Sequence, residues 1–234
     1  MNIALILAGG AGSRMGEDIP KQFIEVDDRP VIVYTLLAMQ NHLEIDKIQI
    51  VCIKGWEEQL REYANKFDIT KLNNIVTGGK TRFESTKIGM ESLGNVADED
   101  VIIVHDAARP LVTVESLSDT IAVCKRYGNS MTVLDCVDTM YDRTTNEYTN
   151  KEVARGNLAR GQTPEAVTGK RMREMYKAAE EKNIKLDSIS ALQIALGWRV
   201  YFAKGSERNI KLTRKEDIEL FKALLIMEKD EWLK

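Results

Sequence analysis

Asn2-Ile-Ala-Leu-Ile-Leu-Ala-Gly-Gly-Ala-Gly-Ser-Arg-Met-Gly16 is the stretch of the chain that decides the fold. Its apolar first half predicts a buried strand, and four glycines follow within eight residues. Glycine lets the backbone curl until successive N–H groups point at one anion. Arg14 adds positive charge there, and so does Lys21 in the Pro-Lys-Gln that follows. The segment therefore predicts a triphosphate-binding loop.

Two better-known phosphate loops do not match. The dinucleotide pattern G-x-G-x-x-G needs glycine where Met15 stands, and the Walker A pattern ending at Gly79-Lys80-Thr81 needs glycine where Asn74 stands. A turn that binds nothing remains the alternative. It is less favoured, because such a turn has no need of Arg14 and Lys21 together.

Composition limits the class of protein. The chain has 234 residues, enough for one large domain with its own core, and we expect a single domain over 1–234. Its net charge of −3 argues against a nucleic-acid partner. The N-terminal apolar run is too short for a membrane span and lacks a basic flank. We therefore expect no membrane partner. No C-x-x-C pair is formed by Cys52, Cys124 and Cys136, so we expect reduced cysteines in a cytoplasmic protein.

Strand-length apolar runs alternate with helix-length stretches through the first half of the chain. The predicted strands are Asn2–Leu7, Lys47–Ile53, Asn74–Thr77, Val101–Val104 and Ser130–Leu134, and the predicted helices are Pro30–Met39, Trp56–Lys66, Ser85–Leu93 and Val114–Tyr127. Such alternation predicts an α/β fold, a three-layer α/β/α sandwich around a mostly parallel sheet. Ligands of such sheets bind at the carboxyl ends of strands, here after the first, third and fourth.

The alternation breaks over residues 136–162. Thr139–Asp142 and Glu147–Asn150 flank polar turn residues, which predicts a hairpin. The segment has few large apolar residues to bury, so it projects either as a solvated excursion or as an arm to a partner subunit. Periodic structure then resumes, with helices near Gly169–Lys182 and Ser190–Leu196, a strand at Arg199–Ala203 and a terminal helix from Arg214.

Charged residues outside the glycine loop suit the same ligand. Asp106 follows the Val101–Val104 strand, where it could hold Mg²⁺ together with phosphates or pair with Arg109 to shape the turn. Lys211 could contact phosphates or remain a solvated lysine. Arg155, near the end of the arm, has the geometry for bidentate phosphate recognition, although surface arginines are common.

Seven motifs carry a resemblance, and in chain order they are Leu7-Ala8-Gly9-Gly10-x-Gly12-x-Arg14-Met15-Gly16, Pro20-Lys21-Gln22, Gly78-Gly79-x-x-Arg82-x-x-Ser85, His105-Asp106-Ala107-Ala108-Arg109-Pro110, Asp138-Thr139, Gln162-Thr163-Pro164 and Asn209-Ile210-Lys211-x-Thr213. From end to end the chain resembles the cytidylyltransferases that act on methylerythritol 4-phosphate or ribitol 5-phosphate. The resemblance implies a Rossmann-like nucleotidyltransferase fold with a projecting β-arm. It also implies transfer of CMP from CTP to a small polyol phosphate, with release of pyrophosphate.

The resemblance also assigns roles to residues. Arg14, Lys21 and Lys211 match the catalytic cations, and Asp106 matches the Mg²⁺ ligand. The matched nucleotide-binding residues are Leu7, Ala8, Gly9, Gly10, Gly12, Gly79, Arg82 and Ser85, and the matched acceptor-binding residues are Thr139, Arg155, Asp106 and Arg109. In this family the arm offers acceptor contacts across a homodimer interface.

The chain departs from the family pattern at three places. Glu165-Ala166-Val167 replaces a common Gln-x-Phe, Leu186-Asp187 replaces a Thr-Asp pair, and Lys80 replaces an acidic residue. Leu7–Gly10 and Gly161–Pro164 favour the ribitol enzymes, which serve cell-surface polymers such as teichoic acid or capsule. The methylerythritol enzymes of isoprenoid biosynthesis are the alternative, and a catalytically silent sugar-nucleotide binding domain is a further one.

Overall fold

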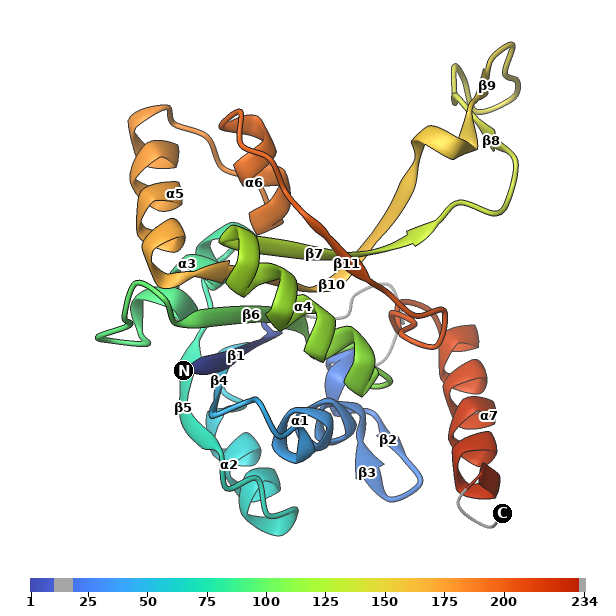
Figure 1. Ribbon diagram of the computed structural model, residues 1–234. Coiled ribbons are helices and arrows are strands. Elements are labelled where there is room, and N and C mark those ends of the chain that lie inside the picture. The colour runs from blue at the N-terminus through green and yellow to red at the C-terminus, as the bar shows by residue number, and fades with distance from the viewer. Residues whose placement is uncertain (11–18, 232–234) are drawn as a thin grey trace.

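The computed structural model describes residues 1–10 and 19–231, and these form a seven-stranded sheet (Figure 1). The strands, in spatial order, are β11 (Phe202–Lys204), β7 (Asn129–Asp135), β10 (Ala159–Thr168), β6 (Val101–Asp106), β1 (Asn2–Ala8), β4 (Lys47–Cys52) and β5 (Leu72–Thr77). β1 runs parallel to both β4 and β6, β4 to β5, and β7 to β11. The predicted mostly parallel sheet is confirmed.

Helices cover both faces of the sheet, as predicted. They are α1 (Val31–Asn41), α2 (Glu57–Lys66), α3 (Arg82–Glu91), α4 (Val114–Tyr127), α5 (Gly169–Glu181) and α6 (Ile189–Ala195). The last helix, α7 (Lys215–Glu231), instead packs against α1 and β2 (Figure 1). Side chains of β1 alternate between the faces: Ala4 and Ile6 pack with α1, α2 and α4, while Ile3 and Leu5 pack with α3, α5 and α6. Both faces of the strand are therefore buried, which explains its unbroken apolar run.

β10 is a strand of the main sheet that the sequence pattern does not predict. It lies between β6 and β7 and runs antiparallel to both. Pro164 cannot donate to a ladder, and glycine weakens a strand, so Gly161–Pro164 argues against a central strand. The strand accommodates these residues with a shift of its register against β7 between Gly161 and Glu165.

The arm projects from the ends of β7 and β10 (Figure 1). Its hairpin pairs β8 (Met140–Tyr141) with β9 (Glu152–Val153), so the prediction of the second strand at Glu147–Asn150 is wrong. A 3-10 turn, η3 (Arg155–Asn157), leads back to β10. No residue from 136 to 160 is buried, which agrees with a segment that has little apolar surface to hide.

Smaller features complete the fold. A 3-10 turn, η2 (Lys21–Phe23), precedes a short hairpin of β2 (Glu25–Val26) and β3 (Arg29–Pro30). Cys52 and Cys124 are buried and Cys136 is half-buried, and all three are free thiols, as expected. None of the helices described within 1–10 and 19–231 has the length and apolar character that a membrane crossing requires.

Candidate active site

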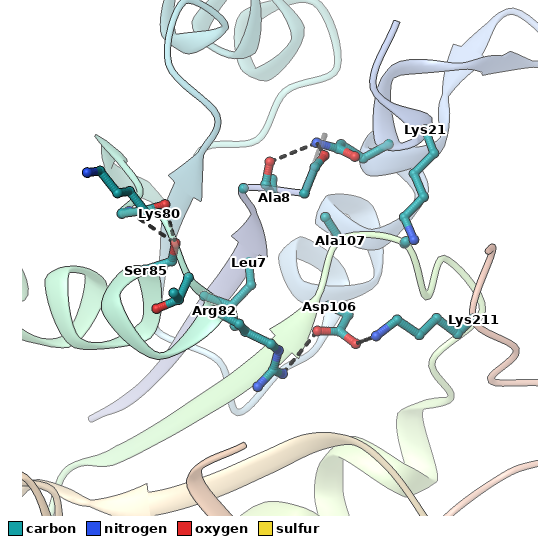
Figure 2. A pocket seen from close by; sticks show the side chains of 15 residues that line it. Leu7, Ala8, Lys21, Lys80, Arg82, Ser85, Asp106, Ala107 and Lys211 are labelled. Carbon is teal, nitrogen blue, oxygen red and sulfur yellow. Dashed lines mark hydrogen bonds and ion pairs between the residues drawn. The ribbon is translucent and has the colours of Figure 1, made fainter. Parts of the chain in front are cut away.

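A cavity of about 410 Å³ opens at the carboxyl ends of β1, β5 and β6 (Figure 2). These are the first, third and fourth strands of the predicted pattern, so the cavity lies where the sequence predicts the ligand. The residues that line it are Leu7, Ala8, Gly9, Gly10, Lys21, Gln22, Gly79, Lys80, Thr81, Arg82, Ser85, Asp106, Ala107, Ala108 and Lys211. Two predicted site residues, Gly12 and Arg14, lie outside the described residues.

Gln22 holds the described part of the glycine loop. Its side chain is 2% exposed, and Nε2 donates to the carbonyl oxygens of Ala8 at 2.7 Å and Gly10 at 3.1 Å. The η2 turn that buries Gln22 places its neighbour Lys21 at the cavity wall (Figure 2). The sequence assigned no role to Gln22, although a glutamine beside an expected phosphate-binding lysine is a detectable signal.

The loop from Gly78 to Ser85 forms the opposite wall. Thr81 caps α3 by accepting a hydrogen bond from Glu84 N, so the helix begins at Arg82 rather than at the predicted Ser85. Ser85 Oγ accepts from Gly79 N at 3.1 Å. A Cβ atom at Gly79 would lie 2.4 Å from Cβ of Glu84, so only glycine fits there. Lys80 and Thr81 also line this wall and had no assigned site role.

Asp106 is the centre of charge at the floor of the cavity. It ends β6, and its carboxylate meets Arg82 Nη2 at 3.1 Å, Lys211 Nζ at 2.7 Å and Arg109 Nε at 3.8 Å. Burial alone would raise the pKa of Asp106, but the charges of Arg82, Lys211 and Arg109 outweigh it and hold the pKa well below its ordinary value. Asp106 is therefore ionised across the physiological range.

The Asp106–Arg109 ion pair weighed from sequence exists, but it is the longest of the three contacts. Arg109 does not line the cavity. Its Nη1 atom donates to Asn209 O at 2.7 Å, so it supports the loop that carries Lys211. Of the described residues assigned to the acceptor, only Asp106 lies at the cavity.

Two amide side chains, Asn209 and Gln162, bring the Lys211 loop to the cavity. Asn209 Nδ2 donates to Thr163 O at 2.7 Å, and Gln162 Nε2 donates to Ser206 O at 3.1 Å. Leu212 N donates to Ala108 O at 2.9 Å, which ties the loop to the end of β6. Gln162 and Asn209 stood in the sequence motifs without a role. Their role, building the site, depends on contacts between distant segments.

Thr139 and Arg155 do not join the cavity of their own chain. Thr139 lines a separate hollow within the arm, and Arg155 Nη1 donates to the carbonyl oxygen of Val137. Their assignment to the acceptor stays a prediction.

The described residues hold no group of three or more histidine, cysteine, aspartate or glutamate side chains placed to bind a metal ion. Asp106 is the described carboxylate that lines the cavity. A divalent cation there would therefore need further oxygen ligands from a substrate or from water.

Comparison with known proteins agrees with this geometry. The family model described as "IspD: 2-C-methyl-D-erythritol 4-phosphate cytidylyltransferase" matches residues 2–228. A ribitol-5-phosphate cytidylyltransferase of Lacticaseibacillus paracasei is 38% identical, covering 96% of this chain and 98% of the relative. One of Vibrio parahaemolyticus is 34% identical, covering 96% of each. A 2-C-methyl-D-erythritol 4-phosphate cytidylyltransferase of Clostridium tetani is 33% identical, covering 93% and 87%.

A solved structure shares the fold. The 4-diphosphocytidyl-2C-methyl-D-erythritol synthase of Anaerococcus prevotii superposes with a TM-score of 0.81 at 28% identity. The match covers 96% of this chain and 98% of that chain.

Proposed function

The chain belongs to the 2-C-methyl-D-erythritol 4-phosphate cytidylyltransferase family, and from that premise we propose that it transfers CMP from CTP to ribitol 5-phosphate. The products are CDP-ribitol and pyrophosphate. The observation that carries the choice of acceptor is the similarity, over nearly the whole chain, to two relatives named for ribitol 5-phosphate at 38% and 34% identity. Leu7–Gly10 and Gly161–Pro164 support the same choice.

Transfer of CMP requires neutralisation of negative charge more than it requires acid–base catalysis. A phosphate oxygen of the acceptor attacks the α-phosphorus of CTP, a new P–O bond forms, and the bond to pyrophosphate breaks. The attacking phosphate is already anionic near neutral pH, so a site needs to position the groups and stabilise negative charge. Lys21, Arg82 and Lys211 line one cavity and meet that requirement. Arg14 is proposed to join them.

Mg²⁺ is proposed as the cofactor, with Asp106 as its protein ligand. Mg²⁺ is commonly held by one or two carboxylates together with substrate phosphates. The single ionised carboxylate of Asp106 at the cavity floor fits this coordination pattern. When bound, the ion would neutralise phosphate charge. Lys211, which also contacts this carboxylate, would then be available to phosphate oxygens.

The nucleotide is proposed to lie between the glycine loop and the Gly78–Ser85 loop. The two loops approach closely, since a Cβ atom at Gly9 would be 3.5 Å from Ser85 Oγ. Backbone and hydroxyl groups on both sides suit a small pyrimidine. A site that hydrogen-bonds the cytosine amino group discriminates strongly against uracil, which presents an acceptor there.

A homodimer is proposed, in which the arm completes the acceptor site of the neighbouring subunit. Val137, Tyr141 and Tyr148 expose 65%, 60% and 62% of their surface on the arm, an apolar area that a partner would cover. Thr139 and Arg155 lie on the same segment, away from their own cavity.

We also propose a cytoplasmic location and a role in supplying precursors for cell-surface polymers. Three free cysteines fit a reducing compartment. The net charge of −3 fits small-molecule substrates rather than nucleic acid or an anionic membrane as partners.

The test is pyrophosphate release from CTP with purified protein and a panel of polyol phosphates. We expect higher kcat/KM with ribitol 5-phosphate than with methylerythritol 4-phosphate, and much lower turnover when UTP or ATP replaces CTP. Equal or faster turnover of methylerythritol 4-phosphate, the acceptor named for the Clostridium tetani relative, would overturn the choice of ribitol 5-phosphate but leave CMP transfer intact. No turnover with any acceptor would indicate a silent binding domain.

A further inference from the structure

Glu165 is a buried carboxyl group beside the site that the transfer chemistry does not use. It lies on β10 opposite Val104 of β6, and 4% of its surface is exposed. Val167, two residues further along the strand, packs into the core on the α3, α5 and α6 side, so Glu165 faces the same layer. Burial raises the pKa of this carboxyl group. A carboxyl placed in an apolar layer costs stability, so a compensating role is expected.

Its hydrogen-bond partner belongs to the segment that leads into α6. Ser188 Oγ donates to Glu165 Oε1 at 2.6 Å. Ser188 Oγ also accepts a hydrogen bond from Ala191 N at 3.1 Å, so Ser188 is the N-cap of α6. The hydroxyl proton and a lone pair of Ser188 are thus both engaged. Glu165 therefore connects the central strand β10 to the start of α6.

The residue before Ser188 reaches the active site through Arg82. The carbonyl oxygen of Asp187 accepts a hydrogen bond from Arg82 Nη1, while Arg82 Nη2 donates to Asp106 Oδ1 at 3.1 Å. A guanidinium group is a rigid planar fork, so two acceptors on different nitrogens define the orientation of its plane. One of these acceptors is the central carboxylate of the cavity, and the other belongs to the residue that precedes Ser188.

Electrostatics support the same grouping. Burial alone would lower the pKa of Arg82, but Asp106, Glu165 and Asp187 outweigh it and raise the pKa. The Arg82 side chain is 25% exposed and lines the cavity, so its remaining N–H groups are available to a bound phosphate. A small rotation of this plane would misdirect those donors.

We propose that Glu165 is a positioning residue: through Ser188 it fixes the Asp187 carbonyl group, and that carbonyl group orients Arg82 for the phosphates that react. The role requires a hydrogen-bond acceptor at Glu165 rather than a negative charge. The kinetic part of the inference rests on the proposed cytidylyltransferase reaction, while the structural part concerns Arg82 itself.

The kinetic test compares two replacements of similar length. Glu165→Met keeps the volume and removes the acceptor, and we expect kcat to fall about tenfold or more, as small misplacements of a positioning group do. KM for CTP should change less, because Gly79 and Ser85, the proposed contacts to the base, are bonded to each other rather than to Glu165 or Ser188. Glu165→Gln retains an amide oxygen for Ser188 and should keep kcat near that of the unmodified enzyme.

A second variant guards against a folding defect in Glu165→Met. Ser188→Ala removes the same contact from the other side, and it also removes a helix cap. Thr113→Ala is the matched control, because Thr113 Oγ caps α4 by accepting from Ser116 N at 3.2 Å and does not line the cavity. We expect Ser188→Ala to lower kcat and Thr113→Ala to leave it unchanged.

The decisive readout does not require activity. In ¹⁵N spectra of arginine-labelled protein, the guanidinium signals of Arg82, assigned with Arg82→Lys, report hindered rotation while both Nη atoms are bonded. We expect this signature to be lost in Glu165→Met and Ser188→Ala and kept in Glu165→Gln. An unchanged signature in Glu165→Met and Ser188→Ala would overturn the inference whatever the kinetics. Unmodified protein that turns over no polyol phosphate would instead overturn the proposed function.

Discussion

Nζ of Lys211 lies 2.7 Å from Oδ2 of Asp106, joining the loop before α7 to the end of β6. The lysine side chain is 39% exposed and the aspartate side chain 10%, so the cation is neutralised on one side and faces the cavity on the other. Arg82 meets the second oxygen of the same carboxylate (Figure 2). The fold thus holds two cations at one carboxylate, and such fixed charges reduce the reorganisation that charge stabilisation costs.

Lys21→Ala should lower kcat by about a hundredfold or more, because removal of one charge-stabilising donor has an effect of that order. The fold should survive, since the buried members of the same turn are Gln22 and Phe23. Steady-state kinetics and thermal unfolding check both statements. Lys66→Ala, an exposed lysine at the end of α2, is the control. We expect the same loss for Arg14→Ala. A near-normal kcat in Lys21→Ala would remove this residue from the site.

Asp106→Asn should abolish turnover while the chain still folds. The amide keeps the shape of the side chain but leaves Arg82 and Lys211 without their shared counter-charge. Chelation with EDTA should stop the unmodified enzyme, and added Mg²⁺ should restore it but not the variant. Activity that persists in EDTA would contradict the role of the metal.

Gly10→Ala should raise KM for CTP without loss of stability. A Cβ atom at Gly10 meets no atom of the described residues within 4 Å, so we expect the added methyl group to occupy space proposed for the nucleotide. Gly156→Ala, on the arm, has equally open surroundings and serves as the control. Unchanged KM together with unchanged thermal stability would place the nucleotide elsewhere.

Mixed dimers should recover activity that two inactive homodimers lack. If Arg155 serves the neighbouring site, a dimer of one Arg155→Ala and one Lys21→Ala subunit holds one site with both lesions and one with neither. Co-expression with two affinity tags isolates the mixed species for assay. Activity no greater than that of the parents, or an active monomer in ultracentrifugation at assay concentration, would contradict a shared site.

Stability should rise with pH between about 4 and 6.5 because of His105. Burial lowers its pKa to about 4, so in this window the unfolded chain binds more protons than the folded one. The shift from 6.5 corresponds to a loss of about 3 kcal/mol on acidification. Urea unfolding at pH 7 and pH 4.5 should show a smaller difference for His105→Gln. Part of the pH dependence should remain in His105→Gln, because burial also lowers the pKa of His42. An equal slope in His105→Gln would contradict this assignment.

Most helices and strands from β1 to β7 can be predicted from the local sequence pattern. α4 has the predicted bounds, Val114–Tyr127, because its apolar spacing is helical, Thr113 caps one end and Gly128 adopts a left-handed conformation at the other. α3 begins earlier than predicted, at Arg82, because Thr81 caps it. β9 lies later than predicted, because a mainly polar hairpin has no buried face to set its register.

The sequence by itself determined the first strand and the end of the sheet at which the cavity lies. These features depend on hydrophobic periodicity, on glycine positions and on the direction of parallel strands. Each of these can be read from residues close together in the sequence. Only the tertiary structure decided that β10 enters between β6 and β7, that Asn209 and Gln162 carry Lys211 to Asp106, and that Glu165 reaches Arg82 through Ser188. Each of those contacts joins segments far apart in the chain, and its energy comes from burial and hydrogen bonding that exist only once the sheet has formed.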